Sequence, residues 1–197
     1  FDGQKPVLMM IGGSLGAQTV NAVLREALPA LTKRFDVLHV CGKGNLDNKL
    51  AGITGYAQFE YANAELTDMF ALADMAISRA GANSICELLA LHKPNILIPL
   101  SAAASRGDQV LNAKSFKKQG FSYVIEEEEL TRDSLLSAVK EVYGNRDKYK
   151  DAMAKSGEMD SIATIIDLIN SQVKKSSYGQ NLFKASLLII KKKKPGY

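Results

Sequence analysis

The sequence predicts an α/β fold: a Rossmann-like, doubly wound parallel sheet of about six strands with helices on both faces. Two observations predict it. Short apolar runs alternate along the chain with amphipathic segments of helical periodicity. The strand-like runs are apolar throughout, which is typical of strands buried on both faces of a parallel sheet. Parallel neighbours need crossover connections, so the intervening helices cover the two faces.

Six runs have the composition and length of buried strands, and the run NILIPL is the most β-like of them. The predicted strands are 6–11, 36–40, 56–61, 75–77, 95–100 and 123–125. Glycine-containing segments close the first two runs, as expected where a strand gives way to a turn.

Helical spacing of apolar residues marks the segments between the strands. In the first of them the apolar positions are Val20, Val23, Leu24, Ala27, Leu28 and Leu31. The later predicted helices are 46–51, 65–72, 84–91, 108–119, 134–143, 149–155 and 162–173. No Pro-, Gly- or Ser-rich linker divides residues 1–172, so we predict one domain over that range.

The basic character of the chain is concentrated at its end. Residues 173–197 hold seven lysines and no acidic residue, whereas residues 1–172 are mildly acidic, so the net charge of +4 does not indicate a nucleic-acid surface. We expect 173–197 to be a disordered or non-native tail. The alternative is a membrane-surface anchor, because the short apolar run LFKASLLII beside clustered lysines suits anionic lipid.

Several classes of chemistry lack their residues. Cys41 and Cys86 have no CxxC spacing and are predicted to be reduced, buried thiols of a cytosolic protein. His39 and His92 are isolated and are predicted to be structural. No Ser/His/Asp set, no metal-ligand cluster and no Asp-x-Asp pattern is visible, and the acidic run 126–129 is predicted to be a solvated loop.

Ligands of doubly wound sheets bind at the carboxyl ends of the strands, and three segments there are informative. The first is GGSLGA, with Gly13 and Ser14, between the first strand and its helix. Glycines permit close backbone approach and the helix start favours an anion. The segment is neither GxGxxG nor a P-loop, and a simple tight turn is the alternative.

The second segment is SRAGANSICE at residues 78–87. The amides of Ala82, Asn83 and Ser84 suit a pyrophosphate at a helix start, and the Glu87 carboxylate suits both hydroxyls of a ribose. The alternative is a capping box, in which Ser84 and Glu87 bond each other's backbone amides. From spacing alone this box is the favoured interpretation.

The third segment follows the run NILIPL and contains small residues and then RGDQVLN. Asp108, Gln109 and Asn112 occupy the first turn of a predicted helix, with Asp108 and Asn112 on one face. Amides and a carboxylate suit a hydroxyl-rich ligand such as a sugar. The alternative is a helix N-cap with solvated neighbours.

Three motifs in order carry a family resemblance: GGSLGAQTVN, FALADMAISRAGANSICELLALHKPNILIPL and ASRGDQVLNAKSFKKQG. Over about residues 5–170 the chain resembles the C-terminal, donor-binding half of the MurG family of peptidoglycan glycosyltransferases. The resemblance implies one half of a GT-B enzyme, which has two Rossmann-like domains with the active site between them. It also implies transfer of GlcNAc from UDP-GlcNAc to lipid I, giving lipid II, by metal-independent inversion without a cofactor.

The resemblance assigns the three segments to parts of the donor. It places the first near the diphosphate and sugar, the second at the diphosphate with Glu87 at the ribose, and the third at the hydroxyls of GlcNAc. The uracil is implied near residues 61–63. The residues so implied to bind UDP-GlcNAc are Gly13, Ser14, Ala82, Asn83, Ser84, Glu87, Asp108, Gln109 and Asn112.

The family also has an N-terminal domain that binds the lipid acceptor and supplies the base, and we expect that domain to be absent from residues 1–197. This chain is then expected to bind donor, to hold no catalytic residue, to be inactive alone and to expose apolar surface toward the missing half. The implied location of the whole protein is the cytoplasmic side of the bacterial membrane, as a peripheral protein.

Three other functions stay open. One is a different UDP-sugar GT-B transferase, such as a diacylglycerol glucosyltransferase. Another is the donor-binding subunit of a split two-chain glycosyltransferase, with the basic tail as its anchor. The last is a nucleotide-binding regulator, which a lack of preference for UDP would support.

Overall fold

The structure is a computed structural model that describes residues 1, 3–12, 17–62, 65–101 and 107–156. Its strands are β1 (Val7–Ile11), β2 (Asp36–Val40), β3 (Tyr56–Phe59), β4 (Met75–Ser78), β5 (Asn95–Leu97) and β6 (Tyr123–Val124). Its helices are α1 (Gln18–Leu31), α2 (Leu66–Leu72), α3 (Ala82–Ala90), α4 (Asp108–Lys118), α5 (Arg132–Gly144) and α6 (Arg146–Ser156). Two 3₁₀ turns, η1 (Asn48–Leu50) and η2 (Glu127–Glu129), complete the described elements.

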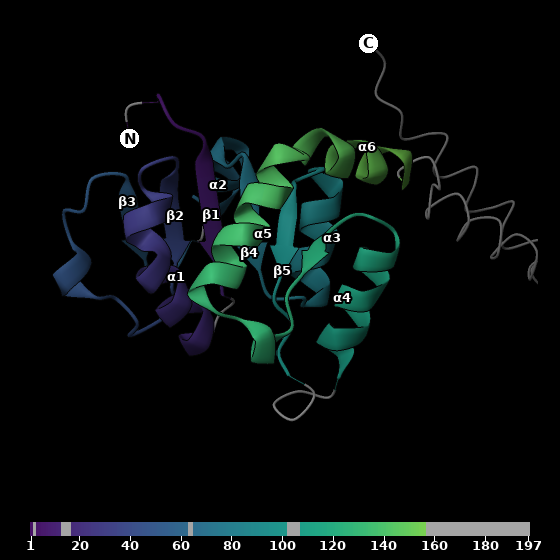
Figure 1. The fold of residues 1–197 in the computed structure, drawn as a ribbon, viewed down its shortest axis with the longest axis horizontal. Helices are drawn as coiled ribbons and strands as arrows, with labels where there is room; N and C mark the ends of the chain where they lie inside the picture. Colours follow the sequence, from purple (N-terminus) through teal and green to yellow (C-terminus); the bar gives the residue numbers. More distant parts are fainter. Residues whose placement is uncertain (2, 13–16, 63–64, 102–106, 157–197) are drawn as a thin grey trace, which may run out of the picture. The chain divides into compact units, whose positions relative to one another are not determined.

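All six strands are parallel and lie in the order β3-β2-β1-β4-β5-β6. Figure 1 shows the first five from left to right, with α1 and α5 in front of them. This order is that of a doubly wound sheet, in which the chain builds outward from β1 in one direction and then from β4 in the other. The predicted fold class is therefore confirmed.

The sheet separates two apolar cores because successive side chains of a strand point to opposite faces. Along β1, Leu8 and Met10 pack with α1 and α5, and we call this cluster the α1/α5 core. Val7 and Met9 pack with α2, α3 and α4, in the α2/α3/α4 core. Both faces of β1 are thus buried, which accounts for its uninterrupted apolar sequence.

Proline explains two differences from the predicted strand bounds. Proline has no N–H to give to a ladder, so strands exclude it. β1 begins at Val7, after Pro6, and β5 ends at Leu97. The Ile98 amide still donates to Ser78 O at 2.9 Å, but Pro99 cannot continue the pattern. The predicted helix 46–51 is only the 3₁₀ turn η1.

Two further predictions concern exposure and the end of the chain. Cys41 is buried as predicted, but Cys86 is exposed, because it lies on the solvent side of α3. The chain divides into two units, Phe1–Lys155 and Ser156–Tyr197. The predicted helix 162–173 and tail 173–197 lie outside the described residues. No helix within the described ranges is long and apolar enough to cross a membrane.

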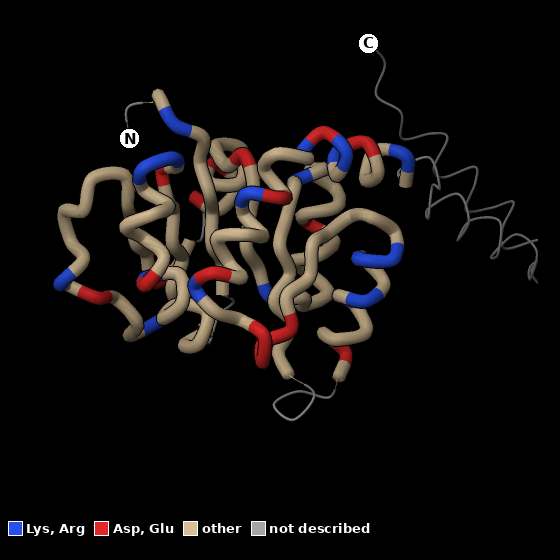
Figure 2. The backbone as a smooth tube through the Cα atoms, in the orientation of Figure 1, with Lys and Arg blue, Asp and Glu red and all other residues tan. Residues whose placement is uncertain are grey.

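Charged residues of both signs are interspersed along the described backbone (Figure 2). The acidic run at 126–129 is the main departure from this mixing. It lies between β6 and α5, at the edge of the sheet where the strands end. Its position brings it into the candidate functional site.

Candidate functional site

β1 and β4 are neighbours whose following helices lead to opposite halves of the sheet, so their carboxyl ends form the topological switch point. These ends lie at the lower edge of the sheet in Figure 1. After β1, Gly12 is buried and its amide donates to Val40 O at 3.4 Å. The predicted site residues Gly13 and Ser14 lie outside the described residues, so their role stays a prediction.

After β4, the chain turns directly into α3, which begins at Ala82 with Gly81 as its N-cap. The first intrahelical bond runs from the Ile85 amide to Gly81 O at 3.0 Å. The preceding amides, of Ala82, Asn83 and Ser84, therefore have no acceptor within the helix. Ala82 and Asn83 are exposed and no acidic residue occupies the first turn. The start of α3 can accept an anion.

The capping-box interpretation of Ser84 and Glu87 is wrong. A capping box requires the serine at the N-cap position. The helix α3 begins at Ala82, so Ser84 is its third residue and does not occupy the N-cap. Gly81 takes the N-cap position in an extended conformation, with φ −67° and ψ 146°. The Ser84 and Glu87 side chains are therefore not committed to each other's backbone.

Glu87 lies on the second turn of α3 and is exposed. Among the described residues, no hydrogen bond or ion pair engages its carboxylate. An exposed carboxylate one turn from amides that have no acceptor within the helix is placed to accept hydrogen bonds from hydroxyl groups.

The third segment starts α4. Gly107 is its N-cap and has φ +82°, a left-handed conformation that glycine adopts without strain. The N-cap interpretation of Asp108 is therefore wrong, because Asp108 is the first residue of the helix itself. Its side chain is exposed at this end of the sheet.

The side chains of Gln109 and Asn112 both form hydrogen bonds to neighbouring backbone. Gln109 Oε1 accepts from the Leu100 amide at 3.1 Å, and Asn112 Nδ2 donates to Ala80 O at 3.0 Å. In each side-chain amide, one polar atom is therefore engaged in a hydrogen bond within the protein. Asn112 thereby ties the start of α4 to the segment just before α3, which brings the second and third predicted segments together.

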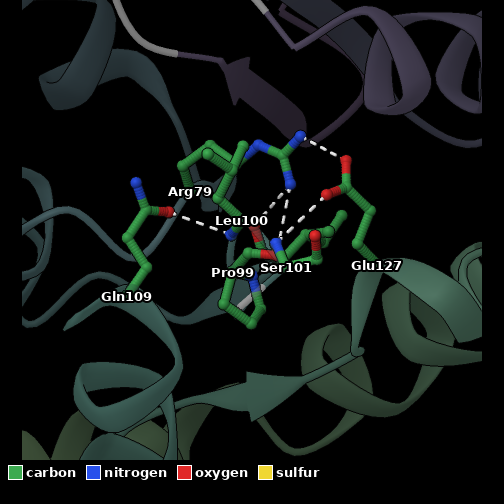
Figure 3. A network of polar contacts seen from close by, with 7 residues as sticks. Arg79, Pro99, Leu100, Ser101, Gln109 and Glu127 are labelled. Carbon is green, nitrogen blue, oxygen red and sulfur yellow. Dashed lines mark hydrogen bonds and ion pairs between the residues drawn. The ribbon is translucent and has the colours of Figure 1, made fainter. Parts of the chain in front are cut away.

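A buried ion pair that the sequence did not predict joins Arg79 of the second segment to Glu127 (Figure 3). Arg79 follows β4 directly and is 8% exposed. Its guanidinium Nη2 donates to Glu127 Oε1 at 2.5 Å, and its Nη1 donates to Ile98 O at 3.1 Å and Pro99 O at 3.3 Å. Glu127 Oε2 accepts from the Ser101 amide at 3.3 Å. The pair joins the segments that follow β4, β5 and β6.

The solvated-loop prediction for 126–129 is thus wrong for Glu127, whose side chain is 17% exposed. A signal was present: an arginine directly after a buried strand needs a buried partner, because an unpaired buried charge is costly. Four consecutive glutamates and a separation of 48 residues hid which carboxylate would supply it.

A second buried polar cluster connects α1, β2 and β3. Asn21 Nδ2 donates to Cys41 O at 2.9 Å, so Asn21 Oδ1 faces His39 Nε2 at 2.9 Å as the acceptor. His39 Nδ1 then accepts from the Tyr56 hydroxyl at 2.8 Å. Burial, together with the Arg25 charge, lowers the pKa of His39 from 6.5 to about 3. His39 is a neutral structural residue of β2.

Other expectations find partial correspondence. Tyr61, near the implied uracil position, is exposed, while Asn63 lies outside the described residues. The expected apolar surface toward the missing half stays a prediction. Segments that follow strand ends carry three exposed apolar side chains, those of Leu46, Tyr61 and Leu111, which are far apart in sequence. Within the described part of the chain, no group of three or more His, Cys, Asp or Glu could hold a metal ion.

The fold and this edge define a class of protein: a doubly wound α/β domain with a helix start at its switch point, that of α3, that can accept an anion. Residues 7–169 match the glycosyltransferase family 28 C-terminal domain. The chain belongs to that family, and its resemblance to MurG is confirmed.

The relatives have one name, UDP-N-acetylglucosamine--N-acetylmuramyl-(pentapeptide) pyrophosphoryl-undecaprenol N-acetylglucosamine transferase. The chain is 57% identical to that of Geobacillus thermodenitrificans over 171 residues, 87% of this chain and 48% of the relative. It is 55% identical to that of Clostridium perfringens over 169 residues, 86% of this chain and 47% of the relative. The chain thus spans about half the length of the curated relatives it matches.

Solved structures agree on the fold. The crystal structure of Acinetobacter baumannii MurG matches with a TM-score of 0.66 at 23% identity, over 86% of this chain and 51% of that one. The calicheamicin glycosyltransferase CalG4 matches with a TM-score of 0.63 at 15% identity, over 89% of this chain and 44% of that one. At these identities the likeness is one of fold alone.

Proposed function

We propose that residues 1–172 are the UDP-GlcNAc-binding domain of a transferase that moves GlcNAc to lipid I in peptidoglycan synthesis. The observation that carries the proposal is the start of α3, where three amides without helical acceptors lie at the switch point of a chain 57% identical to such a transferase. The diphosphate binds these amides, and the α3 dipole stabilises the charge of the UDP leaving group.

The other site residues have distinct roles in this proposal. Glu87 accepts hydrogen bonds from the ribose hydroxyls. Asp108, Gln109 and Asn112 meet the sugar, and Gly13 and Ser14 approach the diphosphate and sugar from the other side of the switch point. The donor's own charge is met by backbone amides, so binding requires no metal ion.

The acceptor and the base belong to the half of the relatives' length that this chain does not cover. Inversion at the anomeric carbon requires a base that deprotonates the acceptor hydroxyl. We place that base in the uncovered half, so these 197 residues bind donor without transferring it. The whole protein acts at the cytoplasmic face of the bacterial membrane as a peripheral protein, and 173–197 is a separate basic tail.

The test is a calorimetric titration of the 197-residue chain with UDP-GlcNAc, UDP-glucose and ADP-glucose in EDTA. We expect UDP-GlcNAc to bind most tightly, and Glu87→Ala to weaken it by about 10- to 100-fold, since hydrogen bonds to a charged group are lost. Glu26→Ala, an exposed site on α1, is the matched control and leaves the affinity unchanged. Equal binding of UDP-glucose favours another UDP-sugar transferase, and equal binding of ADP-glucose contradicts the proposal.

A further inference from the structure

The proposed donor site is built from two helix starts that belong to different crossovers. α3 carries the diphosphate and ribose residues, and α4 carries the sugar residues. A UDP-sugar that touches both requires a fixed distance between them. What holds the two starts in place therefore decides how well the sugar and the nucleotide are bound together.

The Arg79–Glu127 pair lies at the centre of this arrangement. Arg79 is two residues before Gly81, the N-cap of α3, and adjoins Ala80, whose carbonyl accepts from Asn112 on α4. Glu127 accepts from the Ser101 amide, next to Leu100, whose amide donates to Gln109 on α4. Figure 3 shows Gln109 on one side of the Leu100–Ser101 backbone and Glu127 on the other.

The hydrogen bonds of the pair are directed into the protein. The two Nη atoms of Arg79 bond Glu127 and the carbonyls of Ile98 and Pro99, and the guanidinium is almost fully buried. Its charge is neutralised by Glu127 at 2.5 Å. Arg79 is therefore oriented toward the segments it joins, and not toward a diphosphate at the start of α3.

We infer that Arg79 and Glu127 are positioning residues of the donor site: the pair fixes the starts of α3 and α4 relative to each other, without touching the donor. The inference rests on the proposed function. The inference predicts different effects on the binding of UDP and of UDP-GlcNAc. UDP needs the α3 residues, whereas UDP-GlcNAc needs both helix starts, so loosening the pair weakens UDP-GlcNAc more than UDP.

The experiment measures the dissociation constants of UDP and UDP-GlcNAc, and the melting temperature, for the full 197-residue chain and its variants. Glu127→Gln keeps the size of the side chain and an acceptor oxygen but removes the charge. Arg79→Lys keeps the charge but loses the fork of donors. For both we expect UDP-GlcNAc to weaken about tenfold and UDP by less than about threefold. Arg132→Met, in an exposed pair with Asp133, is the matched control and leaves both dissociation constants unchanged.

The double variant Arg79→Met/Glu127→Leu separates positioning from stability. It removes both buried charges, so its melting temperature recovers relative to Arg79→Met alone. The bonds to Ile98, Pro99 and Ser101 are still missing, so the preference for UDP-GlcNAc over UDP stays reduced. Recovery of that preference, or equal weakening of both ligands in Glu127→Gln, overturns the inference.

The two proposals fail in different ways. A parent chain that binds neither ligand removes the proposed function, and the inference with it. A parent that prefers UDP-GlcNAc, with variants that keep the same ratio of dissociation constants, removes the inference alone. If Arg79→Met does not fold, Glu127→Gln and Arg79→Lys still decide the result.

Discussion

At the scale of single residues, buried His39 makes the stability of the protein depend on pH. Its pKa is about 3 in the folded protein and 6.5 ordinarily, so below pH 6.5 the unfolded chain binds a proton that the folded chain cannot. The contribution of His39 to the free energy of unfolding is therefore complete above pH 6.5 and lost as the pH falls. Between pH 7.5 and 5 we expect a loss of about 2 kcal/mol, measured by urea unfolding.

The matched variants are His39→Gln and His92→Gln. His39→Gln loses the bond that Tyr56 donates and is less stable at pH 7.5, but its free energy of unfolding changes less between pH 7.5 and 5. His92 is exposed, so His92→Gln keeps the pH dependence of the parent. An unchanged pH dependence in His39→Gln would show that His39 is not the titrating group.

At the scale of elements, the start of α5 has the capping box that α3 lacks. Thr131 Oγ1 accepts from the Ser134 amide at 3.1 Å, and Ser134 Oγ accepts from the Thr131 amide at 2.8 Å. Thr131→Ala removes one of these bonds, so we expect a loss of about 1 kcal/mol in the free energy of unfolding. Thr19→Ala, at an exposed position in α1, is the control and costs less. Equal effects of the two substitutions would contradict the role of the box.

Comparison of the predicted with the observed elements shows what the sequence could and could not predict. The pattern at 84–87 predicted a box that does not exist, because the end of β4 places the chain in position to start α3 at Ala82. Apolar runs predicted the strands well, and the predicted strand 36–40 matches β2 in both bounds. A strand that is buried on both faces has a continuous apolar sequence, which can be recognised without knowing the fold. The partner of Arg79 could not be predicted, since only the folded sheet brings Glu127 beside it.

At the scale of the whole molecule, the sheet determines both where ligands bind and how the two cores are separated. The strand order places β1 beside β4 and β4 beside β5, so the strand ends that lead into the three predicted segments converge although those segments are far apart in sequence. Their convergence needed only the fold class, whereas the bonds that tie α4 to the segment before α3 needed the structure. The backbone of the sheet lies between the α1/α5 core and the α2/α3/α4 core.

Substitutions in one core should therefore be coupled to each other and independent of substitutions in the other. Ile77 and Ile96 are register partners on β4 and β5 in the α1/α5 core, and Ile85 lies in the α2/α3/α4 core. Each Ile→Val change costs about 0.5–1.5 kcal/mol in the free energy of unfolding. In urea unfolding we expect the costs of Ile77→Val and Ile85→Val to add within about 0.5 kcal/mol, and those of Ile77→Val and Ile96→Val to deviate from additivity by more. Equal deviations in the two pairs would mean that the cores respond as one.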